Sequence, residues 1–148
     1  MTTTAPLVDS RVIGLAHYAA RAVLERVLAR HGVTFQQSVT LRLASVADRP
    51  LERERLADDV VASLKVTAAE AHDTIEELIA ARLLAPEPSS RVRITDTGRE
   101  LYDTSSAETG AIAARIYAGI PAEDRAVAGR VLTLVAERAN AELATVDK

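Results

Sequence analysis

Histidines and neighbouring carboxylates are the residues of this chain whose types could support catalysis or metal binding. None of the three histidines, His17, His31 and His72, stands in HExxH or any other zinc-binding spacing. Asp58 and Asp59 are adjacent in sequence, so on a helix their side chains point apart and make a poor acid–base pair. The chain also lacks a glycine-rich phosphate loop and a GxSxG motif. We therefore predict no catalytic residue, no metal site and no cofactor.

Composition bounds the size and class of the protein. The chain has 148 residues, of which 48% are hydrophobic and 26% charged, so it can form one domain, or a small domain with an oligomerisation element. It contains no cysteine, which excludes disulfides, thiolate metal sites and a cysteine redox switch. The formal charge of −3 argues against non-specific nucleic-acid binding, although a local basic patch is enough for a specific DNA reader.

Neither a membrane span nor a signal peptide is evident. No run of about 18 apolar residues occurs. The first ten residues, MTTTAPLVDS, do not combine a basic segment with a following apolar one. We therefore expect a cytoplasmic protein without a membrane partner.

Hydrophobic periodicity predicts a largely helical chain. Helices are expected over 10–30, from 34 to shortly before Pro50, over 51–63 and 67–83, from about 95 onward, and from about 121 onward. Two of them begin with capping boxes, in which Thr34 pairs with Gln37 and Thr67 pairs with Glu70. The residues at 103–113 favour a helix only weakly, so we expect a kink or a break there.

The first and last helices have unusually wide apolar faces. Apolar residues recur between Val12 and Leu28, and again between Val127 and Leu143, over more than the single stripe of a surface helix. A helix that is apolar on two sides is usually buried both by its own core and by a second subunit. These two helices therefore predict a homodimer.

A short strand and a turn interrupt the helices. RVRIT at 91–95 alternates polar and apolar residues, and the prolines and serines of 85–90 form a turn before it. Two short helices with a tight link, followed by a β-ribbon, describe a winged helix-turn-helix. In that fold the second helix, here 67–83, enters the major groove through its N-terminal residues. The wing offers Arg91 and Arg93 to phosphates or to the minor groove; otherwise both are solvent-facing strand residues.

Three segments, in this order and spacing, resemble the MarR-type transcriptional regulators. GVTFQQSVTLRLAS (32–45) is similar to the family's segment after its first helix. VVASLKVTAAEAHDTIEELIAARLL (60–84) is similar to its helix-turn-helix. RVRITDTGRELYD (91–103) is similar to its wing strand and following helix, where Ile94 to Gly98 matches a Leu-Thr-x-x-Gly pattern. The resemblance covers most of the chain.

The resemblance implies a mainly α-helical fold, a winged helix-turn-helix with N- and C-terminal dimerisation helices and a short β-wing. It divides the chain into an N-terminal dimerisation helix (1–33), a DNA-binding domain (34–100) and C-terminal dimerisation helices (101–148). It further implies a homodimer that binds double-stranded DNA at a palindromic operator. Small aromatic or phenolic effectors would bind in a cleft between the dimer region and the DNA-binding domain, and weaken DNA binding.

Carried onto this chain, the resemblance predicts DNA contacts at Thr67, Ala69, His72, Asp73, Thr74, Arg91 and Arg93. Thr67 is a helix cap on any interpretation, and His72 is otherwise an exposed helix residue. The chain also departs from the family pattern. Residues 51–100 carry seven Lys and Arg against eleven Asp and Glu, a net charge of −4. The wing lacks an Asp-Arg-Arg type tip, and Arg82 stands where a glycine usually ends the second helix.

The same resemblance places three residues of the first helix, His17, Tyr18 and Arg21, at the border of the effector cleft. Arg21 would supply positive charge, and His17 or Tyr18 hydrogen bonds, to an anionic aromatic ligand. The alternative is that Tyr18 packs in the core and Arg21 is exposed. Because the chain has only one Phe and three Tyr as aromatic residues, we expect a mostly aliphatic cleft.

The sequence therefore predicts a ligand-responsive, DNA-binding transcriptional regulator that acts as a homodimeric repressor, and not an enzyme. The acidic second helix and the short wing keep one alternative open. This alternative is a MarR-like dimeric module that binds a small molecule or a protein and has weak or lost DNA binding.

Overall fold

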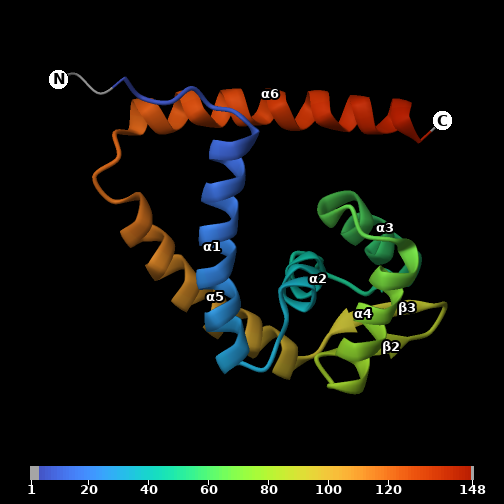
Figure 1. Cartoon of the computed structure of the whole chain (residues 1–148). Coiled ribbons are helices and arrows are strands. Elements are labelled where there is room, and N and C mark those ends of the chain that lie inside the picture. The colour runs from blue at the N-terminus through green and yellow to red at the C-terminus, as the bar shows by residue number, and fades with distance from the viewer. Residues whose placement is uncertain (1–3, 148) are drawn as a thin grey trace. The chain divides into compact units, whose positions relative to one another are not determined.

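The computed structural model describes residues 4–147 and falls into two compact units, one reaching to Gly110 and one beginning at Ala111. The first unit contains helices α1 (Ser10–Arg30), α2 (Phe35–Ser45), α3 (Arg53–Leu64) and α4 (Ala68–Ala80), strands β1 (Leu51–Glu52), β2 (Leu84–Glu87) and β3 (Arg91–Ile94), and most of α5 (Asp96–Tyr117). The second contains the end of α5 and helix α6 (Ala122–Val146) (Figure 1). No helix of the described residues is long and apolar enough to cross a membrane.

Side-chain caps begin three helices of the first unit where the sequence predicts them. Asp9 accepts a hydrogen bond of 2.9 Å from the backbone N–H of Val12. Thr34 and Thr67 each form a complete capping box with the residue three positions later. A cap of this kind contributes about 1 kcal/mol. Because capping depends only on neighbouring residues, the sequence alone located the starts of α1, α2 and α4.

Helix α4 ends three residues earlier than the sequence predicts, because the chain turns sharply after Ala80. Arg82 takes a left-handed backbone conformation, with a φ of 62°. Its N–H donates to the carbonyl of Ile79, and the next N–H, that of Leu83, donates to the carbonyl of Leu78. This pair of bonds is a Schellman motif, whose left-handed position usually holds glycine. The backbone conformation thus explains why glycine is usual at this position, where this chain has Arg82.

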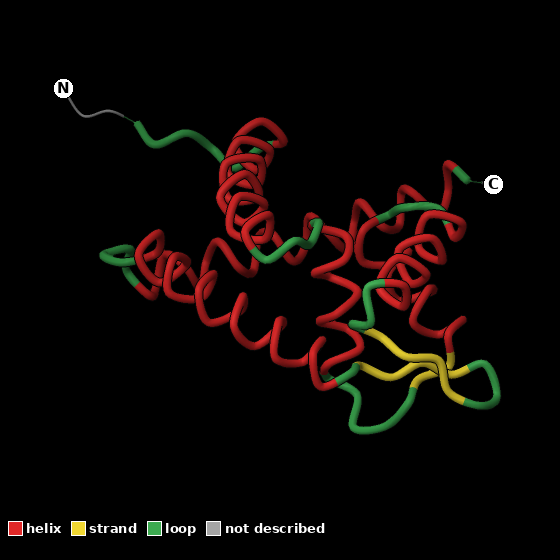
Figure 2. Tube along the Cα trace, turned by 90° about the horizontal axis from the view of Figure 1, so that it is seen from below, coloured by secondary structure: helices red, strands yellow, loops and turns green. Residues whose placement is uncertain are grey.

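The three strands form an antiparallel sheet in the order β1–β3–β2 (Figure 2). Strands β2 and β3 form the wing, and their turn at 88–90 contains two residues of positive φ, Ser89 and Ser90. The sequence assigned β1 to the start of the third helix, and that prediction is wrong because Leu51 pairs with Val92 of β3. A strand of two residues is held by its partner and leaves no periodic pattern of its own in the sequence.

The core of the first unit lies where α2, α3 and α4 pack together and against the sheet. Its largest fully buried apolar side chains are Leu28, Leu41, Leu56, Val60, Ile75, Leu78 and Leu84. Leu28 comes from the end of α1, so α1 is anchored to this core. The two helices of the helix-turn-helix are therefore fixed relative to the wing by a shared apolar interior.

A close junction joins the end of α4 to the start of α5. The hydroxyl of Thr95 donates a 2.7 Å hydrogen bond to the carbonyl of Arg82, and it accepts a 2.9 Å hydrogen bond from the N–H of Gly98. A Cβ at Gly98 would lie 2.1 Å from the carbonyl oxygen of Leu83, so only glycine fits there. The Thr-x-x-Gly pattern in the sequence therefore has a physical reason. The threonine caps α5, and the glycine admits the turn that follows α4.

Helix α5 runs without interruption over its full length, so the predicted break within 103–113 is wrong. The hydroxyl of Ser105, which is buried, donates to the carbonyl of Tyr102. The hydroxyl of Thr109 donates in the same way to the carbonyl of Ser106. These polar side chains, which weaken an isolated helix, are bonded to the backbone of the preceding turn. In addition, Ser105 is buried and Glu108 bonds to Arg30 and His31, so contacts with residues distant in sequence override the low helix propensity.

Helix α6 of the second unit keeps its apolar side chains open to solvent in the single chain. None of its described residues is buried. Its exposed large apolar side chains are Val127, Val131, Leu132, Leu134, Val135, Leu143 and Val146. Near its first turn, the guanidinium of Arg125 lies over the ring of Tyr117, 4.7 Å from the ring centroid. The wide apolar face that the sequence shows is therefore uncovered within one copy.

Candidate nucleic-acid interface and adjoining pocket

Helix α4 presents one face to the core and the opposite face to solvent. Ala71, Ile75 and Leu78 are fully buried. Ala69 and Asp73 are exposed on the opposite face, in the N-terminal half of the helix. A helix-turn-helix reads base edges through this part of its second helix. Both residues therefore lie where the sequence-based prediction requires them.

The two threonines among the predicted contacts have different positions. Thr67 is exposed, and its hydroxyl caps α4 by accepting from the N–H of Glu70 at 3.1 Å. Thr74 is only 3% exposed, and its hydroxyl donates to the carbonyl of Glu70 at 2.9 Å. The same hydroxyl lies 3.2 Å from the amide oxygen of Gln36 on α2. A side chain buried to this degree cannot reach a base edge, so Thr74 is a packing residue and not a DNA contact.

His72 is half-buried between α3 and α4. Its Nδ1 accepts a 3.3 Å hydrogen bond from Nε of Arg53, and its Nε2 lies 3.4 Å from a carboxylate oxygen of Glu54. Arg53 also reaches the carboxylate of Glu76 at 2.5 Å, and its backbone N–H donates to the carbonyl of Ser90 in the wing turn. His72 therefore joins the helices in addition to facing outward. Sequence analysis missed Arg53, because charged residues near a helix start usually form a solvated face.

The exposed surface of α4 is acidic. Its carboxylates are those of Glu70, Asp73, Glu76 and Glu77, and the helix carries no lysine or arginine. Glu70 is engaged in the capping box, and Glu77 accepts a 2.9 Å hydrogen bond from the side-chain amide of Gln37. Asp73 remains as a carboxylate on the outward face. The local field of α4 therefore repels DNA phosphates, although a carboxylate can accept from cytosine N4.

The wing carries its two arginines on one face. Arg91 and Arg93 are exposed and alternate with Val92, which is buried. Nε of Arg93 lies 2.5 Å from a carboxylate oxygen of Glu87 on the neighbouring strand. Among residues 4–147, Arg91 forms no ion pair within the chain. Arg91 is therefore the more available cation of the two.

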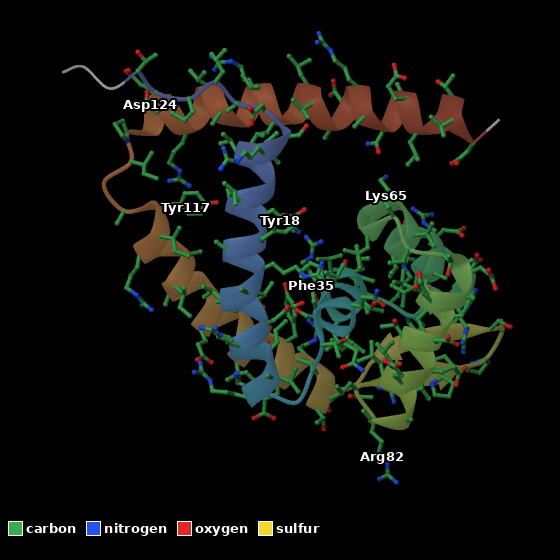
Figure 3. All side chains as sticks on the ribbon, viewed as in Figure 1. Tyr18, Phe35, Lys65, Arg82, Tyr117 and Asp124 are labelled. Atoms are coloured by element: carbon green, nitrogen blue, oxygen red, sulfur yellow. The ribbon has the colours of Figure 1, made fainter. Side chains whose placement is uncertain are left out.

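Two further cations follow the ends of the two helices of the helix-turn-helix. Arg82 follows the end of α4 and Lys65 the end of α3, and both side chains point outward (Figure 3). Each takes a left-handed backbone conformation, with φ values of 62° and 58°. The ammonium of Lys65 donates a 2.7 Å hydrogen bond to the carbonyl of Ala62, at the C-terminal end of α3.

A pocket of about 550 Å³ lies between α1, α2, α3 and α5 of the first unit. Its lining residues are His17, Leu24, Phe35, Ser38, Val39, Arg42, Ser63, Leu64, Tyr102, Ser106 and Thr109. The lining combines apolar side chains with one guanidinium, one phenol, one imidazole and several hydroxyls. A pocket with few, convergent polar groups on an apolar wall suits a small organic molecule.

A clamp holds two walls of this pocket together. The carboxylate of Glu108 on α5 receives the guanidinium of Arg30 and, at 3.0 Å, Nε2 of His31. Both partners stand at the C-terminal end of α1. The clamp therefore fastens α1 to α5 beside the pocket.

Of the three predicted effector residues, the structure brings only His17 into this pocket. Arg21 bonds to Glu25 at 2.9 Å and stacks over the ring of Phe35, 4.3 Å from its centroid. It lines a separate hollow together with carboxylates of α4. Tyr18 is 69% exposed, so it is neither a wall of the pocket nor packed in the core.

Sequence analysis missed Arg42 and Tyr102, which supply the pocket with a guanidinium and a phenol. Both stand on helices whose polar residues look solvent-exposed in one dimension, and only the crossing of α2 and α5 brings them together. Within the described residues, no group of three or more His, Asp or Glu side chains could hold a metal ion.

Comparison with family sequence models and with curated protein sequences gives no match. Solved structures are similar in fold. Sco5413, a MarR family transcriptional regulator from Streptomyces coelicolor, is 20% identical with a TM-score of 0.71, over 88% of this chain and 91% of that chain. The Mycobacterium tuberculosis MarR family protein Rv2887 in complex with DNA is 22% identical with a TM-score of 0.67, over 89% and 98%. The same protein with salicylic acid is 24% identical with a TM-score of 0.60, over 89% and 99%.

These likenesses extend over most of the chain. The identities are all below a quarter, so the likeness concerns how the backbone folds. This chain has the winged helix-turn-helix fold of the MarR family transcriptional regulators.

Proposed function

We propose that this protein is a ligand-responsive transcriptional repressor that binds a palindromic operator as a homodimer. One observation carries the proposal. A capped helix α4, fixed against α3 by a shared core and flanked by a wing, presents its N-terminal half to solvent in a fold that, in Rv2887, is found bound to DNA. No other arrangement in the described residues offers a comparable binding element.

The dimer is supported by apolar surface that one copy leaves open. The exposed apolar residues of α6 extend along its whole length, and α1 adds Leu15 and Val23. Exposed apolar surface of this extent marks an interaction site. A twofold dimer would present two copies of α4, which must lie about 34–36 Å apart to enter successive major grooves.

At each half-site, Thr67, Ala69, His72 and Asp73 of α4 would face the major groove. Arg91 and Arg93 of the wing would face the phosphates or the minor groove. Thr74 is not among these contacts, because its side chain is buried.

The pocket between α1, α2, α3 and α5 would hold the effector. Rv2887 is found with salicylic acid, an aromatic carboxylate. Here Arg42 would pair with such a carboxylate, and Tyr102 or His17 would bond to a phenolic hydroxyl. A ligand that fits the pocket only at one spacing of the two α4 helices would shift the population away from the DNA-competent state.

The acidity of α4 supports a second candidate, a dimeric binding module of the same fold that does not read DNA. Four carboxylates and no lysine or arginine on the second helix are the observation that favours it. This candidate predicts a folded dimer with an occupied pocket and no selective affinity for DNA.

The test is fluorescence anisotropy with duplexes selected from a random pool and with the intergenic DNA upstream of the gene, across a salt series. The repressor predicts selective, palindromic binding that weakens steeply as salt rises. A well-folded dimer that shows no selective binding at low salt, with and without salicylate, would support the binding module instead.

A further inference from the structure

The acidic second helix raises a physical question about the attraction to DNA. Helix α4 contributes four carboxylates and no lysine or arginine. Cations that neutralise phosphates supply the non-specific affinity of a DNA-binding protein and a large share of its specific affinity. The cations must therefore come from another part of the first unit that keeps a fixed position relative to α4.

A hollow of about 470 Å³ at the base of the wing brings three arginines together. Arg49 comes from the loop after α2, Arg55 from α3 and Arg91 from β3. We call these three residues the wing-base arginines. The remaining lining residues are Leu43, Val46, Ala47, Pro50, Leu51, Glu52 and Asp59.

The wing-base arginines are largely available to an outside partner. Within residues 4–147, Arg49 and Arg91 form no ion pair. Arg55 lies 3.9 Å from Asp59 one turn later, and its side chain is 73% exposed. An exposed pair of this length contributes little, so Arg55 can exchange its partner at low cost. Glu52 and Asp59 reduce the charge of the hollow without balancing it.

A second, smaller hollow of about 170 Å³ continues the basic surface on the other side of the same loop. It shares Arg49 and Pro50 with the first hollow and adds Arg93 and Arg99. Asp48 is its only acidic lining residue among those described. Arg49 stands in the loop that joins α2 to β1, and four further arginines line the two hollows, of which Arg93 is paired with Glu87.

The wing-base arginines are held at a fixed position relative to α4. Leu51 pairs with Val92 in the sheet, and the N–H of Arg53 donates to the carbonyl of Ser90 at 2.9 Å. The side chain of Arg53 in turn reaches Glu76 of α4. The base of the wing, α3 and α4 thus move as one body, as a surface that assists DNA reading requires.

We infer that the wing-base arginines contact the phosphodiester backbone of duplex DNA and supply the attraction that α4 lacks. The inference rests on the proposed function. It adds Arg49 and Arg55 to the interface, and it assigns them to backbone positioning, which carries no sequence information by itself. Duplex DNA is the occupant because Arg91 belongs both to this hollow and to the wing, and because the charges are complementary.

The experiment compares the salt dependence of operator binding between the wild type and the double variant Arg49→Gln/Arg55→Gln. Each phosphate contact contributes roughly 0.9 to the slope of log K against log salt, or roughly eight-fold in affinity at 0.1 M salt. We expect the double variant to lose roughly 1.8 units of slope and most of its affinity, for operator and scrambled duplex alike. Glu52→Gln, which removes a carboxylate from the hollow, should tighten binding to both.

The matched control is Arg11→Gln/Arg26→Gln, which makes the same charge change on the exposed surface of α1, and sedimentation velocity verifies that this variant keeps the wild-type mass. It should keep the wild-type slope. Thermal unfolding followed by circular dichroism confirms that each variant is folded. If the wild type binds and the wing-base variant keeps the slope of the control, the inference is wrong and the proposed function stands. If the wild type binds no duplex at low salt, both are wrong.

Discussion

Of the six glycines of the chain, Gly98 is the one at which an added Cβ would come closest to another atom. A Cβ there would lie 2.1 Å from the carbonyl oxygen of Leu83, which is a backbone atom and cannot swing away. We expect Gly98→Ala to destabilise the protein by about 3 kcal/mol or more, because overpacking against backbone requires the chain to move. The measurement is urea unfolding of the purified variant.

The control for this prediction lies in the same helix. A Cβ at Gly110 of α5 would meet nothing within 4 Å, so Gly110→Ala should stabilise by about 0.5–1 kcal/mol through higher helix propensity. Equal destabilisation by both variants would show that glycine is needed in α5 for a reason other than the close approach to Leu83.

At Arg82, in contrast to Gly98, the backbone favours glycine but the chain has a larger residue. It holds a left-handed conformation, with a φ of 62°, in which a side chain is strained. Arg82→Gly should therefore raise the free energy of unfolding by about 0.5–1 kcal/mol, a gain reduced by the greater freedom of glycine in the unfolded chain. Arg82→Ala keeps a Cβ and should leave stability near the wild-type value. Thermal unfolding distinguishes the two, and an equal effect of both would rule out backbone strain as the cause.

At the scale of elements, the start of α4 depends on one hydroxyl. Thr67→Ala removes the cap that satisfies the N–H of Glu70, and we expect a loss of about 1 kcal/mol in stability. Thr67→Ser keeps an oxygen in the same place and should recover most of it. Hydrogen exchange of the first amides of α4 locates the effect, and fraying elsewhere in the variant would contradict the capping role.

Local patterns account for what the sequence predicted, and long-range contacts account for what it did not. Caps at Thr34 and Thr67 and the alternation around Val92 depend on nearby residues, so the helix starts and the wing strand β3 were predicted. Strand β1, the burial of Thr74 and the continuity of α5 depend on partners distant in sequence. The wide apolar face of α6 could be recognised in the sequence because its apolar residues recur at helical spacing within one helix.

The same difference between local and long-range contacts explains which positions of the site residues the sequence predicted and which it did not. The exposed positions of Ala69, Asp73 and Arg91 follow from helix and strand periodicity, and the structure places them outward. The pocket between α1, α2, α3 and α5 draws on four helices, so its polar residues Arg42 and Tyr102 become neighbours only when those helices cross. Arg21 was assigned to the cleft because the resemblance places the first helix at its border, whereas the structure pairs Arg21 with Glu25 and places it in a separate hollow with carboxylates of α4.

At the scale of the whole molecule, α6 carries the clearest prediction about assembly. Val135→Asp places a charge in the exposed apolar face of α6, and we expect the dimer to dissociate and DNA affinity to fall with it. Sedimentation velocity measures the change in mass. Val46→Asp makes the same substitution at an exposed valine outside α6 and should leave the dimer intact; because Val46 lines the wing-base hollow, this control applies to the mass and not to DNA affinity. A monomeric wild type would exclude this mode of assembly.

The hydrogen bonds around Thr95 define the point about which α5 would tilt. They connect the turn that ends α4 to the first turn of α5, so a tilt of α5 about this junction would pull on the end of α4. An unbroken helix of 22 residues is about 33 Å long, so a tilt of about 5° displaces its far end by about 3 Å. A ligand that pushes on the middle of α5 and tilts the helix by a few degrees would thus displace its far end by a few ångströms, without any residue unfolding.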